Sequence, residues 1–312
     1  VSRVLNNPEL VSAETADKVR KAIAATGYKP NLFAKGLMTR KSQVLGFVLP
    51  DIHGEFYSEL LKGADEEARH QGYHLLVSSE ARRNGSDLNP SFGLVDGLAV
   101  MIAEPNNALW KQARDTGLPV VAIDMEVQSE GVDSILIDNI SGTLEATRHL
   151  LAGTPAANLF FVGGPETNFD TRTRADAFVG ALKASGHAAG AKQVAFREYT
   201  ETWGYQWAEH MHGAGLLKPC GVLCANDDIA VGVLQAVEDL GCDVPGDVRI
   251  IGFDDTRLAS IVRPKLSSVH VPMGQVGATA IRLLMKRLEN PGAPSETARL
   301  ETRLVVRESS EK

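Results

Sequence analysis

From Val44 onward the sequence alternates short, continuous apolar runs with longer stretches in which apolar residues recur every three or four positions. The apolar runs predict strands buried on both faces, and the longer stretches predict helices with one apolar face. The expected strands are Val44–Leu49, Tyr73–Ser78, Val95–Ile102, Pro119–Asp124, Ser134–Asp138, Leu159–Gly163, Gln193–Arg197, Gly221–Ala225 and Val248–Phe253. The expected helices are Phe56–Gln71, Asn106–Thr116, Asn139–Leu151, Thr171–Ser185, Thr202–His212, Asp227–Leu240 and Gly274–Glu289. Strands and helices that alternate in this way predict an α/β fold with parallel sheets.

So many strands in a chain of 312 residues favour two Rossmann-like lobes in tandem over a single sheet. Small ligands bind such lobes beyond the carboxyl ends of the strands. The polar residues expected at these ends are Asp51, Asp124, Asn226–Asp227 and Asp254–Asp255. Between Ser79 and Val95 the chain is rich in Gly, Pro and Asn and has no helical pattern, so the crossover helix there is expected to be short or missing.

The N-terminal segment has a different character from the rest of the chain. Val1–Leu45 carries eight Lys or Arg against three Asp or Glu, a balance of +5, so the remainder must carry −12 of the total net charge of −7. A basic segment on an acidic body favours a nucleic-acid partner, with a solvated basic surface as the alternative. Within this segment the sequence predicts a helix that starts after Ser12, buries Val19, Ala22 and Ile23, and ends at Gly27.

Targeting signals and metal motifs are missing from the sequence. It has no apolar run long enough to cross a membrane and no signal-peptide core at its N-terminus. The three cysteines, an odd number, are expected to be reduced core residues of a cytoplasmic protein, and their spacing does not fit a metal site. Because Val1 already lies inside what reads as a helix, we expect an N-terminally truncated chain.

No catalytic motif is present. The sequence lacks a nucleophile elbow, a zinc-protease helix, a phosphate-binding P-loop, and the Gly-rich turn that a dinucleotide would need after the first strand. The histidines are scattered without a metal-binding spacing. We therefore expect neither an enzyme nor a cofactor.

Several polar and aromatic residues are candidates for ligand contact. Asp254 and Asp255 could accept hydrogen bonds from ligand hydroxyls or cap the next helix, and we expect Asp254 to face the ligand and Asp255 to cap. By the same argument Asn226 should face the ligand while Asp227 or Asp228 caps. An arginine at a helix N-terminus is electrostatically unfavourable, which favours ligand contact for Arg174. Aromatic side chains that could stack on a sugar or base, or simply fill the core, are Phe56, Tyr57, Tyr199 and Trp203.

These features together resemble the LacI/GalR family of bacterial transcription regulators. The resemblance covers almost the whole chain. Its blocks are VSRVLNN, VSAETADKVRKAIAATGYKPN, NLFAKGLMTRKS, LGFVLPDIHGEFYSELLKGADEEARHQGYHLLV, VDGLAV, PVVAID, LIDNISGTLEATRHLL, ANDDIAVGVLQAVEDLG, VPGDVRIIGFDD, LSSVHVP and RLVVRES. It implies two lobes of periplasmic-binding-protein type, preceded by a partial helix-turn-helix headpiece at residues 1–29 and a hinge helix at residues 30–42. The effector-binding and dimerisation domain would then span residues 43–312, with an N-lobe of about 43–139 and 271–300 and a C-lobe of about 140–270 and 301–308.

The resemblance also implies roles for individual residues. Arg3 matches a base-contacting arginine, and Leu37 matches the leucine that opens a base step in the minor groove. Further DNA contacts are implied for Ser2, Asn6, Ser12, Tyr28, Asn31 and Ala34. The implied effector contacts are Phe56, Tyr57, Asp124, Arg174, Tyr199, Asn226 and Asp254.

The function implied is that of a transcriptional repressor without metal or cofactor. It would act as a cytoplasmic homodimer on pseudo-palindromic operator DNA, under the control of a small polar effector such as a sugar or a nucleoside. A periplasmic-type sugar-binding protein shares the two-lobed body, but the basic N-terminal segment and the missing signal peptide disfavour it. An α/β enzyme acting on sugars is disfavoured by the lack of a nucleophile–base pair.

Overall fold

The computed structural model describes residues 10–27, 41–50, 54–79, 90–101, 108–125 and 131–311, together with residues 1, 4, 52 and 127. The chain divides into two compact units, Val1–Gln43 and Val44–Lys312. Each unit is described by itself.

The first unit contains the predicted helix, α2 (Ala13–Thr26). The Ser12 side chain caps it by accepting a hydrogen bond from the Thr15 backbone N–H, and Gly27 ends it with a left-handed φ of 63°. Ala16 is buried and Val19 and Ile23 are half-buried, whereas Ala22 is exposed, so the predicted apolar stripe is wrong at Ala22. The other predicted DNA contacts lie outside the described residues: Ser2, Arg3, Asn6, Tyr28, Asn31, Ala34 and Leu37.

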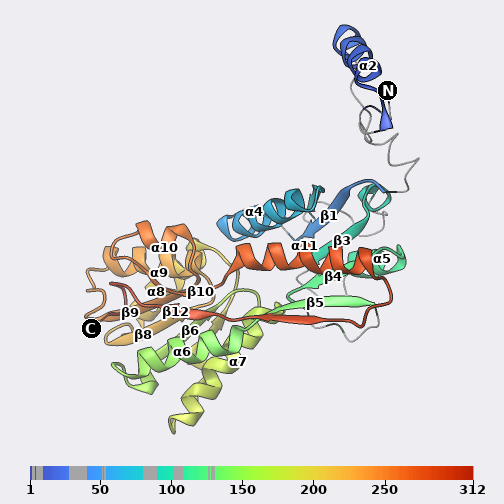
Figure 1. The fold of residues 1–312 in the computed structure, drawn as a ribbon. Coiled ribbons are helices and arrows are strands. Elements are labelled where there is room, and N and C mark those ends of the chain that lie inside the picture. The colour runs from blue at the N-terminus through green and yellow to red at the C-terminus, as the bar shows by residue number, and fades with distance from the viewer. Residues whose placement is uncertain are drawn as a thin grey trace. The chain divides into compact units, whose positions relative to one another are not determined.

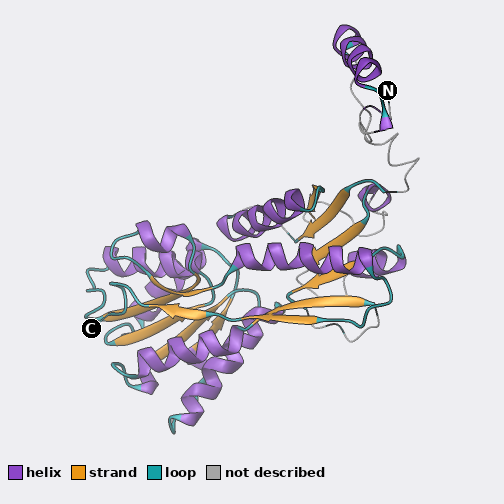
Figure 2. Ribbon diagram, viewed as in Figure 1, coloured by secondary structure: helices purple, strands orange, loops and turns teal. Residues whose placement is uncertain are grey.

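The second unit holds two six-stranded sheets (Figure 2). The first sheet is entirely parallel and has the order β11-β5-β4-β3-β1-β2. Its strands are β1 (Val44–Leu49), β2 (His74–Ser79), β3 (Gly97–Met101), β4 (Val120–Ile123), β5 (Val132–Ile137) and β11 (Thr297–Leu300). Strands β1, β3, β4 and β5 are almost wholly buried, which explains their continuous apolar sequences.

The second sheet has the order β12-β10-β9-β8-β6-β7. Its strands are β6 (Leu159–Gly163), β7 (Val194–Phe196), β8 (Cys220–Cys224), β9 (Val248–Asp254), β10 (Ser267–His270) and β12 (Arg303–Val305). The edge strand β12 pairs with β10 in the antiparallel sense, and the other pairs are parallel. All of the predicted strands are present, whereas β10, β11 and β12 were not predicted as strands.

Helices flank both sheets. Those of the first lobe, defined by the first sheet, are α4 (Glu55–His70), α5 (Ala108–Asp115) and α11 (Met273–Glu289). Those of the second lobe are α6 (Asn139–Leu151), α7 (Phe169–Ala184), α8 (Glu201–Gly213), α9 (Asp227–Asp239) and the short α10 (Arg257–Ile261). In Figure 1, α9 and α10 lie on one side of the second sheet and α6 and α7 on the other. The described part of the crossover before β3 is a 3-10 helix, η2 (Pro90–Leu94), and two further 3-10 turns are η3 (Ala156–Asn158) and η4 (Ala191–Gln193).

In each lobe, two helices touch through their backbones. A Cβ atom added to Gly63 of α4 would lie 2.0 Å from the carbonyl oxygen of Gly274 in α11, which runs alongside α4 (Figure 1). In the second lobe, a Cβ atom on Gly204 of α8 would lie 2.0 Å from the carbonyl oxygen of Ile229 in α9. Only glycine fits at these positions, and both helix pairs are therefore fixed at short range.

The chain passes between the sheets three times, after β5, after β10 and between β11 and β12. Two of these crossings are tied together, since Thr302 Oγ1 donates a hydrogen bond of 2.7 Å to the carbonyl oxygen of Asp138 and the Asp138 N–H donates one of 2.9 Å to Leu300. At the third crossing the Val271 N–H donates to the carbonyl oxygen of Asp254.

Candidate effector cleft

The strand order reverses at β1 in the first sheet and at β6 in the second, and open α/β sheets bind ligands at such points. Phe56 lies in the first turn of α4, which follows β1. Asp170 and Arg174 lie near the start of α7, which follows β6. The topology therefore indicates a ligand site at the carboxyl ends of the strands, where the sequence also predicts the ligand contacts.

Arg174 lies at the centre of a buried polar network. Its side chain is 4% exposed, and its guanidinium donates hydrogen bonds to Asn139 Oδ1 at 2.7 Å and to the carbonyl oxygen of Ala225. Its nearer nitrogen lies 3.9 Å from Asp254 Oδ1, and its guanidinium carbon lies 3.7 Å from the ring centroid of Phe253. Because α7 begins at Phe169, Arg174 lies in its second turn. The unfavourable interaction with the helix N-terminus, from which ligand contact was predicted, therefore does not apply to Arg174.

Asp124 directly follows β4, has a left-handed backbone with φ 57°, and is 9% exposed. Its Oδ1 accepts a bond of 3.4 Å from the Ile137 N–H, whereas its Oδ2 is buried without a donor. Across from it lies Asp170, and the two carboxyl groups interact directly. Burial raises the pKa of Asp124 well above its usual value, and the charge and hydrogen bond of Asp170 raise it further, against the lowering effect of Arg174.

Asp170 was not among the predicted contacts. Its Oδ1 accepts a hydrogen bond of 2.8 Å from Asn139 Nδ2, so Asn139 connects it to Arg174. In the sequence Asp170 reads as an ordinary acidic residue in the first turn of a helix, where it complements the helix dipole. Only the packing of the two lobes places it beside Asp124.

Asp254 ends β9 with an unusual positive φ of 98°, a conformation that costs free energy in a residue with a side chain. Its Oδ1 is buried without a hydrogen-bond donor. Burial raises the pKa of Asp254 to about 7, and Arg174 lowers it whereas Asp228 and Asp170 raise it. Asp254 and Phe56, from different lobes, both line a cavity of about 380 Å³.

The neighbouring Asp255 does not cap a helix, contrary to the prediction. Its carboxylate pairs with His270 Nδ1 at 3.2 Å and with Arg307 at 2.6 Å. The N-cap of α10 is Thr256, which makes no side-chain capping bond. Asp255 therefore joins β9 to β10 and to the C-terminal tail.

The prediction for Asn226 and Asp227 is also wrong in its division of roles. Asn226 itself caps α9, since its Oδ1 accepts a hydrogen bond of 3.0 Å from the Ile229 N–H. Asp227 is buried and accepts bonds from the backbone and hydroxyl of Thr256, at 2.7 and 2.9 Å, and from the Ser268 hydroxyl at 2.6 Å. Asn226 still lies next to Ala225, whose carbonyl oxygen binds Arg174.

The aromatic candidates have different environments. The Tyr199 hydroxyl bonds to Thr171 Oγ1 at 2.5 Å and to Asn168 Oδ1 at 2.9 Å, and burial raises its pKa to about 12. Trp203 donates from Nε1 to the carbonyl oxygen of Gly163. Phe56 and Tyr57 pack edge to face with their ring centroids 5.2 Å apart. Tyr199 and Trp203 thus hold the start of α7 and the end of β6 in place.

Across the described ranges, no three His, Cys, Asp or Glu side chains lie close enough to hold a metal ion. Cys220, Cys224 and Cys242 are free thiols in buried positions. No helix in the described part of the chain is long and apolar enough to span a membrane.

Comparison with known proteins identifies the family. Residues 1–31 match the model of the bacterial regulatory proteins of the lacI family, and residues 148–310 match a periplasmic binding protein-like domain. The chain is 32% identical to the HTH-type transcriptional regulator RegA of Clostridium saccharobutylicum, over 99% of this chain and 94% of that protein. It is 31% identical to catabolite control protein A of Priestia megaterium over the same shares. The chain belongs to the lacI family of bacterial regulatory proteins.

Two solved structures of transcription regulators have a similar fold. The transcriptional regulator CelR in complex with cellobiose superimposes with a TM-score of 0.77 at 25% identity, over 99% of this chain and 94% of CelR. The lac repressor dimer bound to operator and the anti-inducer ONPF has a TM-score of 0.87 at 24% identity, over 100% of this chain and 94% of that one, and shows likeness of fold.

As a lacI-family member, the chain is a DNA-binding transcriptional regulator with a ligand-binding domain, and it is not an enzyme. The predicted family and fold class are thereby confirmed.

Proposed function

We propose that this regulator is a repressor whose affinity for operator DNA is controlled by a small polar effector bound between the two lobes. The observation that carries the proposal is the buried network around Arg174. It joins Asn139 at a crossing and Asp254 and Asp170 in the second lobe, while Asp124 of the first lobe faces Asp170. Asp124 Oδ2 and Asp254 Oδ1 are buried acceptors without donors, as a site that awaits ligand donors requires.

The effector class that fits these acceptors is a donor-rich compound such as a sugar or nucleoside. Hydroxyl groups donate to carboxylate oxygens, and Phe56 offers an apolar ring face at the cavity with Asp254. Cellobiose, a sugar, is the ligand in the structure of the related CelR. Tyr57, Tyr199 and Asn226 are proposed as further effector contacts.

DNA would be bound by the N-terminal headpiece and hinge of a homodimer. The proposed contacts are Ser2, Arg3, Asn6, Ser12, Tyr28, Asn31, Ala34 and Leu37, on a pseudo-palindromic operator. The related lac repressor was solved as a dimer on its operator. In this proposal residues 1–29 are the headpiece, residues 30–42 the hinge and residues 43–312 the effector domain, with the lobe limits given above, and the protein acts in the cytoplasm.

Effector binding would change operator affinity by closing the lobes. A ligand shifts such an equilibrium only by binding the two conformations with different affinity. A ligand held by Asp124 of the first lobe and by Arg174 and Asp254 of the second would bind more tightly to the closed form, in which these groups lie together, than to an open form. The closed form would thereby be favoured in both subunits.

The test is selection of an operator from a random duplex library, followed by retardation assays with and without candidate sugars and nucleosides. Operator affinity should fall steeply with salt, because Lys and Arg neutralise phosphates. Leu37→Ala should weaken operator binding and leave effector affinity unchanged. A protein that binds sugar but retards no selected duplex would instead be a sugar-binding protein without a DNA function, and the proposal would be abandoned.

A further inference from the structure

Among the residues that the structure describes, the cleft contains more carboxylates than cations. The charged groups that face Asp124 are Asp170 and Arg174, and those that face Asp254 are Arg174, Asp228 and Asp170. Arg174 is thus the cation shared by these carboxylates within the described residues. Exposed Arg257 also lines the cavity beside Asp254, and Arg307 is already paired with Asp255.

Asp124 and Asp170 form a like-charge contact across the lobes, since Asp124 follows β4 of the first sheet and Asp170 lies in α7 beside the second sheet. Two ionised carboxylates that interact directly repel each other, so the pair is stable only if it shares a proton or binds a cation. Asp124 is nine-tenths buried, and its Oδ2 finds no donor among the protein groups described. A donor from outside the protein would satisfy this oxygen, and a cationic donor would also relieve the repulsion within the pair.

Ligand groups differ in how well they meet this need. A hydroxyl brings one donor and no charge, so it satisfies one carboxylate and leaves the excess negative charge in place. An ammonium group brings three donors and a positive charge and can bridge both carboxylates. An anionic group would add to the repulsion.

We propose that the effector of this regulator is an amino sugar or a similar amino polyol, whose ammonium group lies between Asp124 and Asp170. Asp170 is then a specificity-determining residue, and Arg174 and Asp254 bind the hydroxyl-bearing part of the ligand. This inference rests on the proposed function, because it uses the same cleft. A metal ion is a poorer occupant, since no set of three ligating side chains in the described residues is placed to hold one.

Binding of the ammonium group would displace the shared proton. Below the pH at which the pair ionises, affinity for the amino ligand should therefore rise up to about tenfold per pH unit, whereas affinity for a neutral sugar should stay flat or fall. Burial and mutual repulsion raise the pKa of Asp124, which extends this dependence above the usual range of a carboxyl group.

The test uses matched triplets of one sugar, its amino analogue and its acid analogue, beginning with glucose, glucosamine and gluconate and continuing with the galactose and mannose series. Calorimetry between pH 5 and pH 7 should find an amino sugar that binds at least tenfold more tightly than its neutral analogue, with affinity rising with pH. Asp170→Asn should remove most of this preference and the pH dependence. Asp170→Ser provides a second variant if the first folds poorly, and exposed Asp115→Asn is the control that should change neither.

Failure of the amino-sugar inference and failure of the proposed repressor function would give different results. If a neutral or acidic sugar binds as tightly as its amino analogue, or if no amino sugar binds, the inference is wrong. The proposed repressor function survives that result provided that some effector still alters operator affinity. If the amino sugar binds and no effector alters operator affinity, the proposed function fails and the ligand class stands.

Discussion

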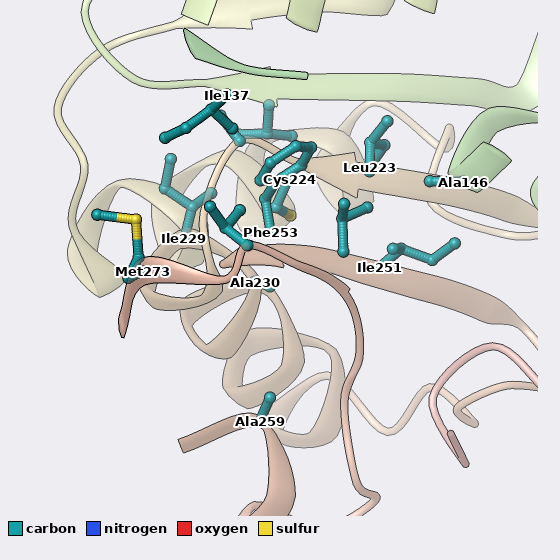
Figure 3. Close-up of a cluster of buried hydrophobic side chains, with 14 of the residues drawn as sticks. Ile137, Ala146, Leu223, Cys224, Ile229, Ala230, Ile251, Phe253, Ala259 and Met273 are labelled. Atoms are coloured by element: carbon teal, nitrogen blue, oxygen red, sulfur yellow. The ribbon is translucent and has the colours of Figure 1, made fainter. Parts of the chain in front are cut away.

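The guanidinium of Arg174 lies over the ring of Phe253, the residue that precedes Asp254 in β9. Phe253 is itself fixed in the core, where it lies beside Cys224 and Ile229 (Figure 3). The Arg174 guanidinium is therefore positioned by the ring of Phe253 as well as by its polar partners. A lysine side chain could not reproduce the planar stacking or the fixed fork of donors of the guanidinium.

Replacement of Arg174 should be costly for both stability and binding. Arg174→Met keeps the side-chain volume but removes the donors to Asn139, Ala225 and Asp254. We expect the unfolding free energy to fall by about 3–5 kcal/mol and effector binding to be lost. Denaturant titration measures the first quantity and calorimetry the second. The matched control is Arg172→Met, because Arg172 pairs with Glu166 on the surface, and that change should cost less than about 1 kcal/mol. Equal effects of the two substitutions would contradict the network.

Asp254 should make stability depend on pH. Its pKa of about 7 in the folded protein lies above the ordinary 3.8, so the folded state holds a proton that the unfolded state has released. Its contribution to stability is therefore full below about pH 4, falls as the pH rises to about 7, and stays low above that. Asp254→Asn should raise the unfolding free energy at pH 8 relative to the wild type by about 1–3 kcal/mol, and not at pH 4. Thermal melts at both pH values measure this, and a gain of the same size at pH 4 would refute the assignment.

The contact between α8 and α9 should tolerate no added side chain. In Gly204→Ala the new methyl group would meet the Ile229 carbonyl oxygen, and we expect a loss of about 2–4 kcal/mol in unfolding free energy. Gly180 of α7 is the control, since it is exposed and a Cβ atom there meets nothing within 4 Å. Gly180→Ala should stabilise the protein by about 0.5–1 kcal/mol through helix propensity. Urea titrations that rank the two variants in the opposite order would be inconsistent with the backbone contact.

Two substitutions separate the capping role of Asn226 from its proposed ligand contact. Asn226→Ser retains an oxygen that can cap α9, so unfolding free energy should change by less than about 0.5 kcal/mol, whereas Asn226→Ala should lose about 1 kcal/mol. If the amide also binds the effector, both variants should lose at least about tenfold in affinity. Unchanged affinity in Asn226→Ser would show that Asn226 has only the structural role.

Most of the strands that the sequence predicted correctly are almost uniformly buried, and the exceptions are the edge strands β2 and β7. Strands such as β4 and β8 are buried at every residue, so their apolar runs are continuous. Strand β10 escaped prediction because Ser267 and Ser268 are buried polar residues. Ser267 Oγ binds the carbonyl oxygen of Arg307 at 2.9 Å and Ser268 Oγ binds Asp227. Because these hydrogen-bond partners lie about 40 residues away, the local sequence around Ser267 and Ser268 shows no strand pattern.

The candidate site was predictable to a similar degree. Asp124, Arg174 and Asp254 were identified because they follow strands or begin a helix, and the structure connects Arg174 to the other two. Asp170 was missed because its significance lies in a contact between lobes. The predicted cap of α9, Asp227 or Asp228, is wrong because a shift of one residue in the start of the helix makes Asn226 the cap.

The glycine contacts of α4 with α11 and of α8 with α9 have a mechanical consequence. Helices can slide past one another when a layer of flexible side chains separates them. Helices whose backbones are in contact lack this layer and cannot slide in this way. Each lobe should therefore move as a stiff body. The width of the cleft would then be set by the backbone torsion angles at the three crossings, which carry Asp138, Val271 and Thr302.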